Sequence, residues 1–172
     1  MVVRGKVHAV DPANKVARVA YGPRGQQQLT GWLPWKPSRT GKAIVWWCPE
    51  IGEGVTVVSD GDLSLGEILP GSYQNDFPAP SEDPDEFLIH FGDGSKVSHH
   101  REESRLTVVN KGNVSLIADG DVTAKAKGAI LVESEQAVTV KAASDMTLST
   151  AANMELKAGG NMKLTASRID FN

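Results

Sequence analysis

The final third of this 172-residue chain repeats a pattern of eight residues, and no other feature constrains its fold as strongly. Eight consecutive octads begin at Ser104, Gly112, Gly120, Gly128, Gln136, Ser144, Ala152 and Gly160. The third and fifth residues of each octad are apolar, as Leu106 and Val108 are in the first, and the seventh is small or polar. A fixed repeat of this kind indicates stacked structural units rather than an irregular globular domain.

The repeat length predicts an extended β-structure. Because eight is an even number, the two-residue alternation of a strand stays in phase through every octad, and even-numbered residues share one face. The charged residues agree, since those from residue 104 to 167 are all odd-numbered: Arg105, Lys111, Asp119, Asp121, Lys125, Lys127, Glu133, Glu135, Lys141, Asp145, Glu155, Lys157 and Lys163. A helix, with 3.6 residues per turn, would scatter these charges around its circumference. The octads therefore predict a β-ribbon with one apolar face.

The apolar face of this ribbon requires a cover that one chain cannot supply. Eight residues are too few for a full coil of a single-chain solenoid, and a lone ribbon cannot bury its own face. Three copies wound about one axis would cover each apolar row and leave no free strand edge. Glycine at the start of an octad, as in Gly112 and Gly120, marks the corner where the strand bends. We therefore expect residues 104–172 to form an intertwined, homotrimeric β-helix.

The alternation ends near the C-terminus of the sequence. Ile169 and Phe171 are odd-numbered, whereas the charged Arg168 and Asp170 are even-numbered. We expect the shaft to end here, with Arg168, Ile169, Asp170, Phe171 and Asn172 forming its apex. Repeated threefold, Ile169 and Phe171 would close the apolar core as a plug.

The N-terminal part predicts a second, differently built region. An expected hairpin over residues 2–19 turns at Asp11-Pro12-Ala13-Asn14, and further short strands are expected at residues 28–33, 43–47, 54–59 and 67–69. About five strands without a helix suggest an OB-fold barrel over residues 1–75. Residues 76–103 then form a proline-rich connector and a β-hairpin neck, with a turn at Gly92-Asp93-Gly94-Ser95. The expected fold class is all-β.

Several motifs carry a resemblance to a known family. They are Trp32-Leu33-Pro34-Trp35, Trp46-Trp47-Cys48-Pro49-Glu50-Ile51-Gly52-Glu53-Gly54-Val55, Arg4-Gly5-Lys6-Val7 with Val10-Asp11, and Phe91-Gly92-Asp93-Gly94-Ser95. Together they resemble the baseplate assembly protein V family of contractile-tailed phages, which is related to the spikes of R-type pyocins and to VgrG proteins. The resemblance extends over nearly the whole chain.

The resemblance implies a central tail spike. An OB-fold collar would sit on the tail tube and baseplate hub proteins, and the trimeric β-helix would transiently puncture the outer membrane of the target cell. The chain has no signal peptide or membrane-spanning apolar run, so we expect synthesis in the bacterial cytoplasm and assembly into the tail baseplate of a virion or pyocin.

One motif of the family has no counterpart here. Family members often carry a His-x-His pair whose three copies bind iron at the apex, yet this sequence ends Ser167-Arg168-Ile169-Asp170-Phe171-Asn172. Three alternatives follow: a PAAR-like tip protein caps the trimer, the apex functions without metal, or the sequence stops short of the natural end. No cofactor is therefore expected apart from an ion on the threefold axis. Three residues, Asn110, His99 and His100, are candidates for an axial ring that holds an ion or water.

The composition weakens the competing function classes. A formal net charge of −3 gives no basic surface for phosphates, so binding of nucleic acid through the OB-fold is disfavoured. Motifs for nucleophilic catalysis or phosphate binding are absent. Glu50 and Glu53, in a glycine-flanked turn, are interpreted as carboxylates that are solvated or hydrogen-bonded to the backbone. We therefore do not expect the protein to be an enzyme. The alternative function is a trimeric fibre or adhesin stalk that binds a cell-surface glycan.

Overall fold

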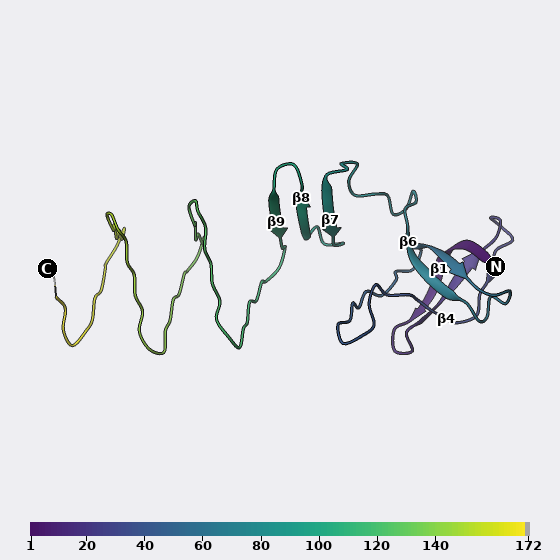
Figure 1. Ribbon diagram of the computed structural model, residues 1–172, viewed down its shortest axis with the longest axis horizontal. Helices are drawn as coiled ribbons and strands as arrows, with labels where there is room; N and C mark the ends of the chain where they lie inside the picture. The colour runs from purple at the N-terminus through teal and green to yellow at the C-terminus, as the bar shows by residue number, and fades with distance from the viewer. Residues whose placement is uncertain (171–172) are drawn as a thin grey trace. The chain divides into compact units, whose positions relative to one another are not determined.

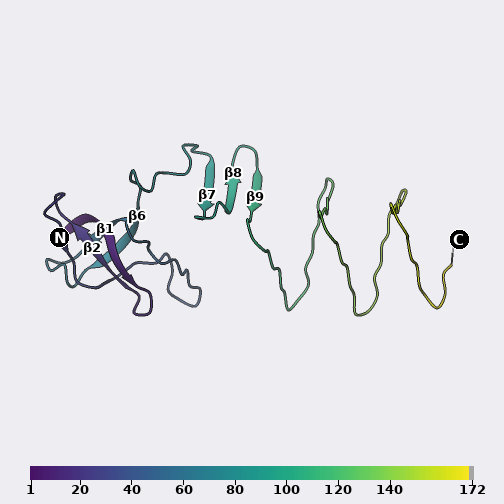
Figure 2. The same cartoon turned by 180° about the vertical axis from the view of Figure 1, so that it is seen from behind.

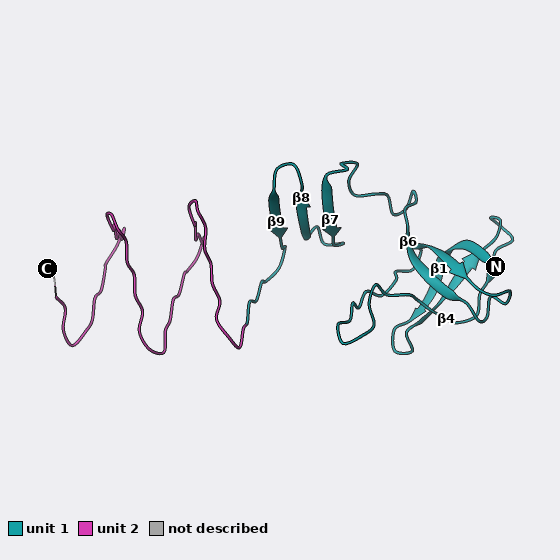
Figure 3. Cartoon of the chain, viewed as in Figure 1, with its two compact units in different colours: residues 1–117 teal, residues 118–172 magenta. Residues whose placement is uncertain are grey.

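The computed structural model describes residues 1–170 (Figure 1). Every regular element within that range is a β-strand, and these residues form no helix. The expected all-β class is therefore confirmed. The chain divides into two compact units, Met1–Ile117 and Ala118–Asn172 (Figure 3).

The first unit begins with the expected hairpin. Strand β1 (Val2–Asp11) pairs antiparallel with β2 (Val16–Tyr21). Asp11 closes the turn, because its carboxylate accepts hydrogen bonds from the backbone N–H of Asn14 at 3.2 Å and from its side chain at 2.7 Å. These bonds stabilise the ionised form and lower the pKa of Asp11. The Pro-Ala-Asn turn predicted from sequence therefore forms.

Four more strands complete the first sheet: β3 (Gln28–Leu29), β4 (Leu33–Pro34), β5 (Gly54–Val58) and β6 (Glu67–Ser72). The strand order is β3-β2-β1-β5-β6, and β4 also pairs with β2. The ladder does not close into a complete barrel. A single bridge between Trp35 and Ile68, with the Lys36 N–H donating to the Ile68 carbonyl at 2.8 Å, brings the chain after β4 against β6.

Two expected strands differ from the prediction. The strand expected at 28–33 is split into β3 and β4, because Thr30 is buried and its hydroxyl oxygen accepts the Val19 N–H at 3.0 Å, in place of a ladder partner. Residues 43–47 form no strand apart from a bridge between Thr40 and Ile44. All five residues, Ala43-Ile44-Val45-Trp46-Trp47, are apolar and exposed, with Ile44 70% exposed, so the segment buries no face in the core.

The core of this sheet is small and, apart from Trp35, aliphatic. Its buried members are Val7, Ala17, Val19, Leu33, Trp35, Val55, Val57 and Ile68. Close approach of β1 and β2 depends on Gly5, where an added Cβ would lie 2.3 Å from the carbonyl oxygen of Ala20. The glycine of the Arg-Gly-Lys-Val motif is therefore required by packing.

A second, three-stranded sheet follows the connector. It consists of β7 (Glu86–His90), β8 (Lys96–His100) and β9 (Arg105–Val109), each antiparallel to its neighbour. The expected hairpin is confirmed, with Asp93 accepting the Ser95 N–H at 2.8 Å and Gly94 at a φ of 86° in its turn. Strand β9 lies within the first octad, so the repeat begins in the last strand of this sheet.

The second unit is an extended chain that bends at regular intervals (Figures 1 and 2). Its bends fall at residues 119–120, 127–128, 135–136, 143–144, 151–152 and 159–160, which is one bend every eight residues. An earlier bend at 111–112, in the first unit, has the same spacing. The bends coincide with the predicted octad corners. Residues 118–170 form no strand ladder within this single chain.

Candidate functional site

The octads carry a long exposed apolar surface. Their even-numbered large apolar side chains are between 50% and 78% exposed: Leu106, Val108, Val114, Leu116, Val122, Ile130, Val132, Val138, Val140, Met146, Leu148, Met154, Leu156, Met162 and Leu164. We refer to this row of residues as the octad face. Monomeric soluble proteins rarely expose apolar surface of this extent, which marks interaction surfaces.

The opposite side of the octads carries the charge. Lys157 and Glu155, both odd-numbered, form an ion pair at 2.7 Å, as expected for side chains two residues apart on one face of an extended chain. Two large apolar residues, Ile117 and Leu131, are also odd-numbered, and they are 87% and 82% exposed. They are more exposed than any member of the octad face.

The three-stranded sheet continues the apolar pattern. Its register aligns Phe87, His99 and Leu106 in one row across the strands and Ile89, Val97 and Val108 in the next. Residues directly opposite in antiparallel strands project to the same face, so these six side chains share one face of the sheet. Because Leu106 and Val108 are the third and fifth residues of the first octad, this face belongs to the same even-numbered pattern.

The two adjacent histidines lie on opposite faces of β8. His100 lies on the polar face, where its Nε2 is 3.0 Å from an Asp83 carboxylate oxygen and its Nδ1 accepts the Glu103 N–H at 3.2 Å. The Asp83 carboxylate raises the pKa of His100. The pKa of Asp83 is lowered mainly by a hydrogen bond from the backbone N–H of Asp85, and to a smaller extent by its hydrogen bond with His100. His100 therefore links the connector to the sheet through its contact with Asp83.

Asn110 is used within the chain. Its side-chain amide donates to the Asn113 carbonyl at 3.0 Å, and its Oδ1 lies 3.5 Å from the Ser95 hydroxyl. The same hydroxyl accepts the Lys111 N–H at 3.0 Å. This arrangement joins the β7–β8 turn to the first octad bend. The axial role expected for Asn110 stays a prediction.

The expected apex is only partly within the described residues. Arg168 donates from Nε to an Asp170 carboxylate oxygen at 2.8 Å, and Ile169 is 47% exposed. Both even-numbered charges thus pair with each other after the last octad. Phe171 and Asn172 lie outside the described residues, so the plug stays a prediction.

The tryptophans do not form one cluster. Trp35 is buried and meets Trp46 edge-to-face at 5.5 Å between ring centroids, whereas Trp47 stacks on Phe91 at 6.0 Å. Trp32, about half exposed, lies under the Arg18 guanidinium at 5.9 Å. The four tryptophans therefore make three separate contacts. Sequence proximity alone could not distinguish these arrangements.

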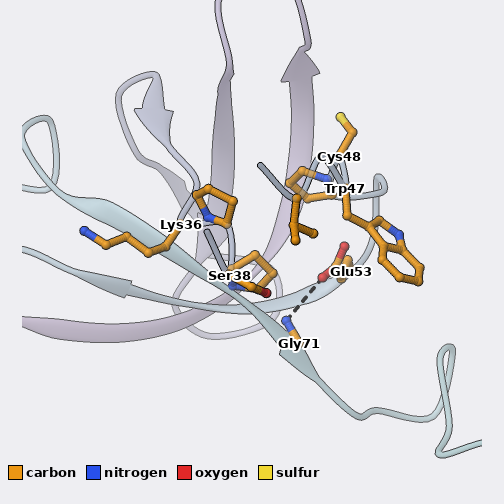
Figure 4. Close-up of a pocket in the computed structure, with 10 residues that line it drawn as sticks. Lys36, Ser38, Trp47, Cys48, Glu53 and Gly71 are labelled. Carbon is orange, nitrogen blue, oxygen red and sulfur yellow. Dashed lines mark hydrogen bonds between the residues drawn. The ribbon is translucent and has the colours of Figure 1, made fainter. Parts of the chain in front are cut away.

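A cleft of about 300 Å³ lies beside Trp47 and Cys48 (Figure 4). Its carboxylate, Glu53, accepts the Gly71 N–H at 3.2 Å and the Glu50 N–H at 2.9 Å, so it stabilises the backbone as the sequence predicted. Partial burial, and secondarily Glu53, raises the pKa of the Cys48 thiol. A thiol held protonated is a poor nucleophile. Cys48 therefore lacks the lowered pKa of a catalytic thiol.

Two further properties hold for residues 1–170. No helix in this range has the length and apolar character needed to cross a membrane. Within a single chain, these residues bring together no group of three or more His, Cys, Asp or Glu side chains that could hold a metal ion.

Comparison with known proteins identifies the N-terminal region. Residues 3–73 match the family of type VI secretion system/phage-baseplate injector OB domains. The chain is also 38% identical over 90 residues to the Spike protein of Escherichia phage P2. That alignment covers 52% of this chain and 43% of the phage protein, so it spans less than half of the relative's length. The matches confirm the resemblance predicted from the tryptophan motifs.

Proposed function

We propose that this protein, whose residues 3–73 belong to the type VI secretion system/phage-baseplate injector OB-domain family, is the trimeric central spike of a contractile tail. In this proposal, residues 1–75 form a collar, residues 76–103 a neck and residues 104–172 a membrane-piercing shaft. The similarity to the Spike protein of Escherichia phage P2 supports a tail-spike role.

The exposed octad face is the single observation that carries this proposal. Covering an apolar side chain of this size contributes about 1.5–3 kcal/mol, so a row this long strongly favours assembly. The row runs through every octad at a fixed spacing, and a cover must therefore have the same repeat. Two further copies of the chain meet this requirement at each level.

The regular bends fit the same assembly. A strand that turns a corner every eight residues can pass from one neighbour to the next around a threefold axis, and its backbone groups can pair between chains. Closure of this kind removes free strand edges, which otherwise recruit unrelated chains. The charged odd-numbered face would then meet solvent. Such a shaft resists bending because its hydrogen bonds connect all three chains at every level.

The two ends of the trimer would have different partners. We infer that the collar binds the tail tube and baseplate hub proteins, by analogy with the family that residues 3–73 match. At the other end, Ile169 and Phe171 would form an apolar apex that either works without metal or receives a PAAR-like tip protein. Synthesis in the bacterial cytoplasm and assembly into a virion or pyocin tail follow from this role.

Molecular mass in solution tests the assembly directly. Light scattering after size exclusion should give three times the chain mass of 18.4 kDa, and the trimer should resist SDS without heating. A folded monomer of 18.4 kDa would overturn the proposal.

The location of the protein tests the role of spike. Quantitative mass spectrometry of purified tail particles should find three copies per particle, and antibodies against residues 1–75 should label the baseplate end. A trimer that is absent from particles but binds target-cell glycan would instead identify the protein as a fibre or adhesin stalk.

A further inference from the structure

His99 is the one ionisable side chain on the apolar face of the three-stranded sheet. Its neighbours in register are Phe87 on β7 and Leu106 on β9, and the next row consists of Ile89, Val97 and Val108. Phe87 and Leu106 are 62% and 67% exposed in the single chain, and His99 is exposed with them. A histidine between two large apolar residues has no electrostatic reason to be there in a monomer.

The octads determine what covers this face. Leu106 is the third residue of the first octad, so it occupies the same even-numbered row as Val114 and Val122. Side chains directly opposite across antiparallel strands lie about 4.5–5.5 Å apart at Cβ. Whatever covers Leu106 therefore also covers His99. In the proposed trimer, that cover is the same face of the other two copies.

Burial of three unpaired imidazoles would be costly without partners. A buried polar group that makes no hydrogen bond destabilises the folded state, and His99 forms none with the part of the chain that the structure describes. His100, by contrast, has both ring nitrogens occupied by Asp83 and Glu103. In the proposed trimer, threefold symmetry puts the His99 rings of the other two chains at the same level along the axis, where they can serve as partners.

We propose that the three His99 side chains bind one divalent transition-metal ion on the threefold axis of the neck. Three neutral imidazoles are a common ligand set for Zn²⁺ and related ions, and one ion accepts the lone pairs of all three at once. This inference rests on the proposed trimer. It also assigns the axial position to His99 rather than His100, whose side chain is on the polar face and already bound.

Cobalt provides the probe, because Co²⁺ bound by imidazoles has visible absorption bands that free Co²⁺ lacks at the same position. The full chain is freed of metal with chelator, its mass is measured, and Co²⁺ is titrated. We expect saturation at one ion per three chains. The His99→Gln variant should bind at least tenfold more weakly, whereas His90→Gln, which removes a histidine from the polar face, should bind like the unmodified protein.

The outcomes separate this inference from the proposed function. A monomer would refute the trimeric spike itself. A trimer that binds no Co²⁺, binds it at another stoichiometry, or binds it equally well after His99→Gln would overturn the metal site alone. If His99→Gln fails to assemble, proton NMR of the unmodified trimer decides the matter. One histidine per chain should then be shifted by paramagnetic Co²⁺, and it should remain in the His90→Gln protein.

Discussion

A leucine-to-alanine exchange on each side of the octads tests the parity argument with matched chemistry. Leu148 belongs to the octad face and Leu131 lies on the charged side, and the two are 72% and 82% exposed in the single chain. Accessibility in one chain therefore barely distinguishes them. Only assembly through the even-numbered face makes their environments different.

The expected magnitudes differ widely. Replacing a leucine with alanine in a covered core costs about 2–5 kcal/mol per chain, because transfer energy is lost and a cavity remains. Since each trimer contains three copies, Leu148→Ala should cost roughly 6–15 kcal/mol per trimer. Exposed substitutions usually stay within about 0.5 kcal/mol, so Leu131→Ala should change trimer stability by no more than about 1.5 kcal/mol.

Guanidinium-induced dissociation followed by light scattering measures this difference, with both variants at the same chain concentration because trimer stability depends on it. The midpoint should fall markedly for Leu148→Ala and stay near that of the unmodified protein for Leu131→Ala. Equal losses in the two variants would refute a one-sided apolar ribbon. A larger loss for Leu131→Ala would show that the opposite face is buried.

Three further predictions concern the first unit. Gly5→Ala should destabilise the collar by about 1–3 kcal/mol in urea denaturation, since a Cβ there would overlap the backbone of β2. Leu33→Ala should cost about 2–5 kcal/mol because Leu33 is fully buried, whereas Leu65→Ala, at a site 75% exposed, should be nearly neutral. The ion pair between His100 and Asp83 should make the stability of the neck depend on pH. The pKa of His100 is higher in the folded state than in the unfolded state, where it is about 6.5. The pair therefore stabilises the fold fully below pH 6.5, and this stabilisation is lost as the pH rises through the folded-state pKa of His100. The pKa of Asp83 is lower in the folded state than its unfolded-state value of about 3.9. Its contribution to stability is therefore complete above pH 3.9 and is lost as the pH falls through the folded-state pKa of Asp83. The protection factor of the connector amides, which is the intrinsic exchange rate at each pH divided by the observed rate, should thus be highest between these limits, and His100→Gln should remove its change near neutral pH.

Local patterns in the sequence were sufficient for the elements with strong turn signals. The Asp-Pro-Ala-Asn turn places the β1–β2 hairpin, and the Gly-Asp-Gly-Ser turn places β7 and β8. Residues 43–47 are a continuous apolar run, yet they form no strand. Such a run forms a strand only when it packs against a core, whereas Ile44 is 70% exposed.

The octad repeat could be identified from local sequence pattern alone. An even period keeps strand alternation in phase, so parity alone separates the apolar face from the charged face, and the observed bends recur at the octad boundaries. The roles of His99 and His100 required tertiary structure, because adjacent residues on a strand look equivalent in sequence. Strand register determines that His99 lies between Phe87 and Leu106, while the path of the connector brings Asp83 to His100. Such pairings depend on contacts between distant residues, which no local pattern encodes.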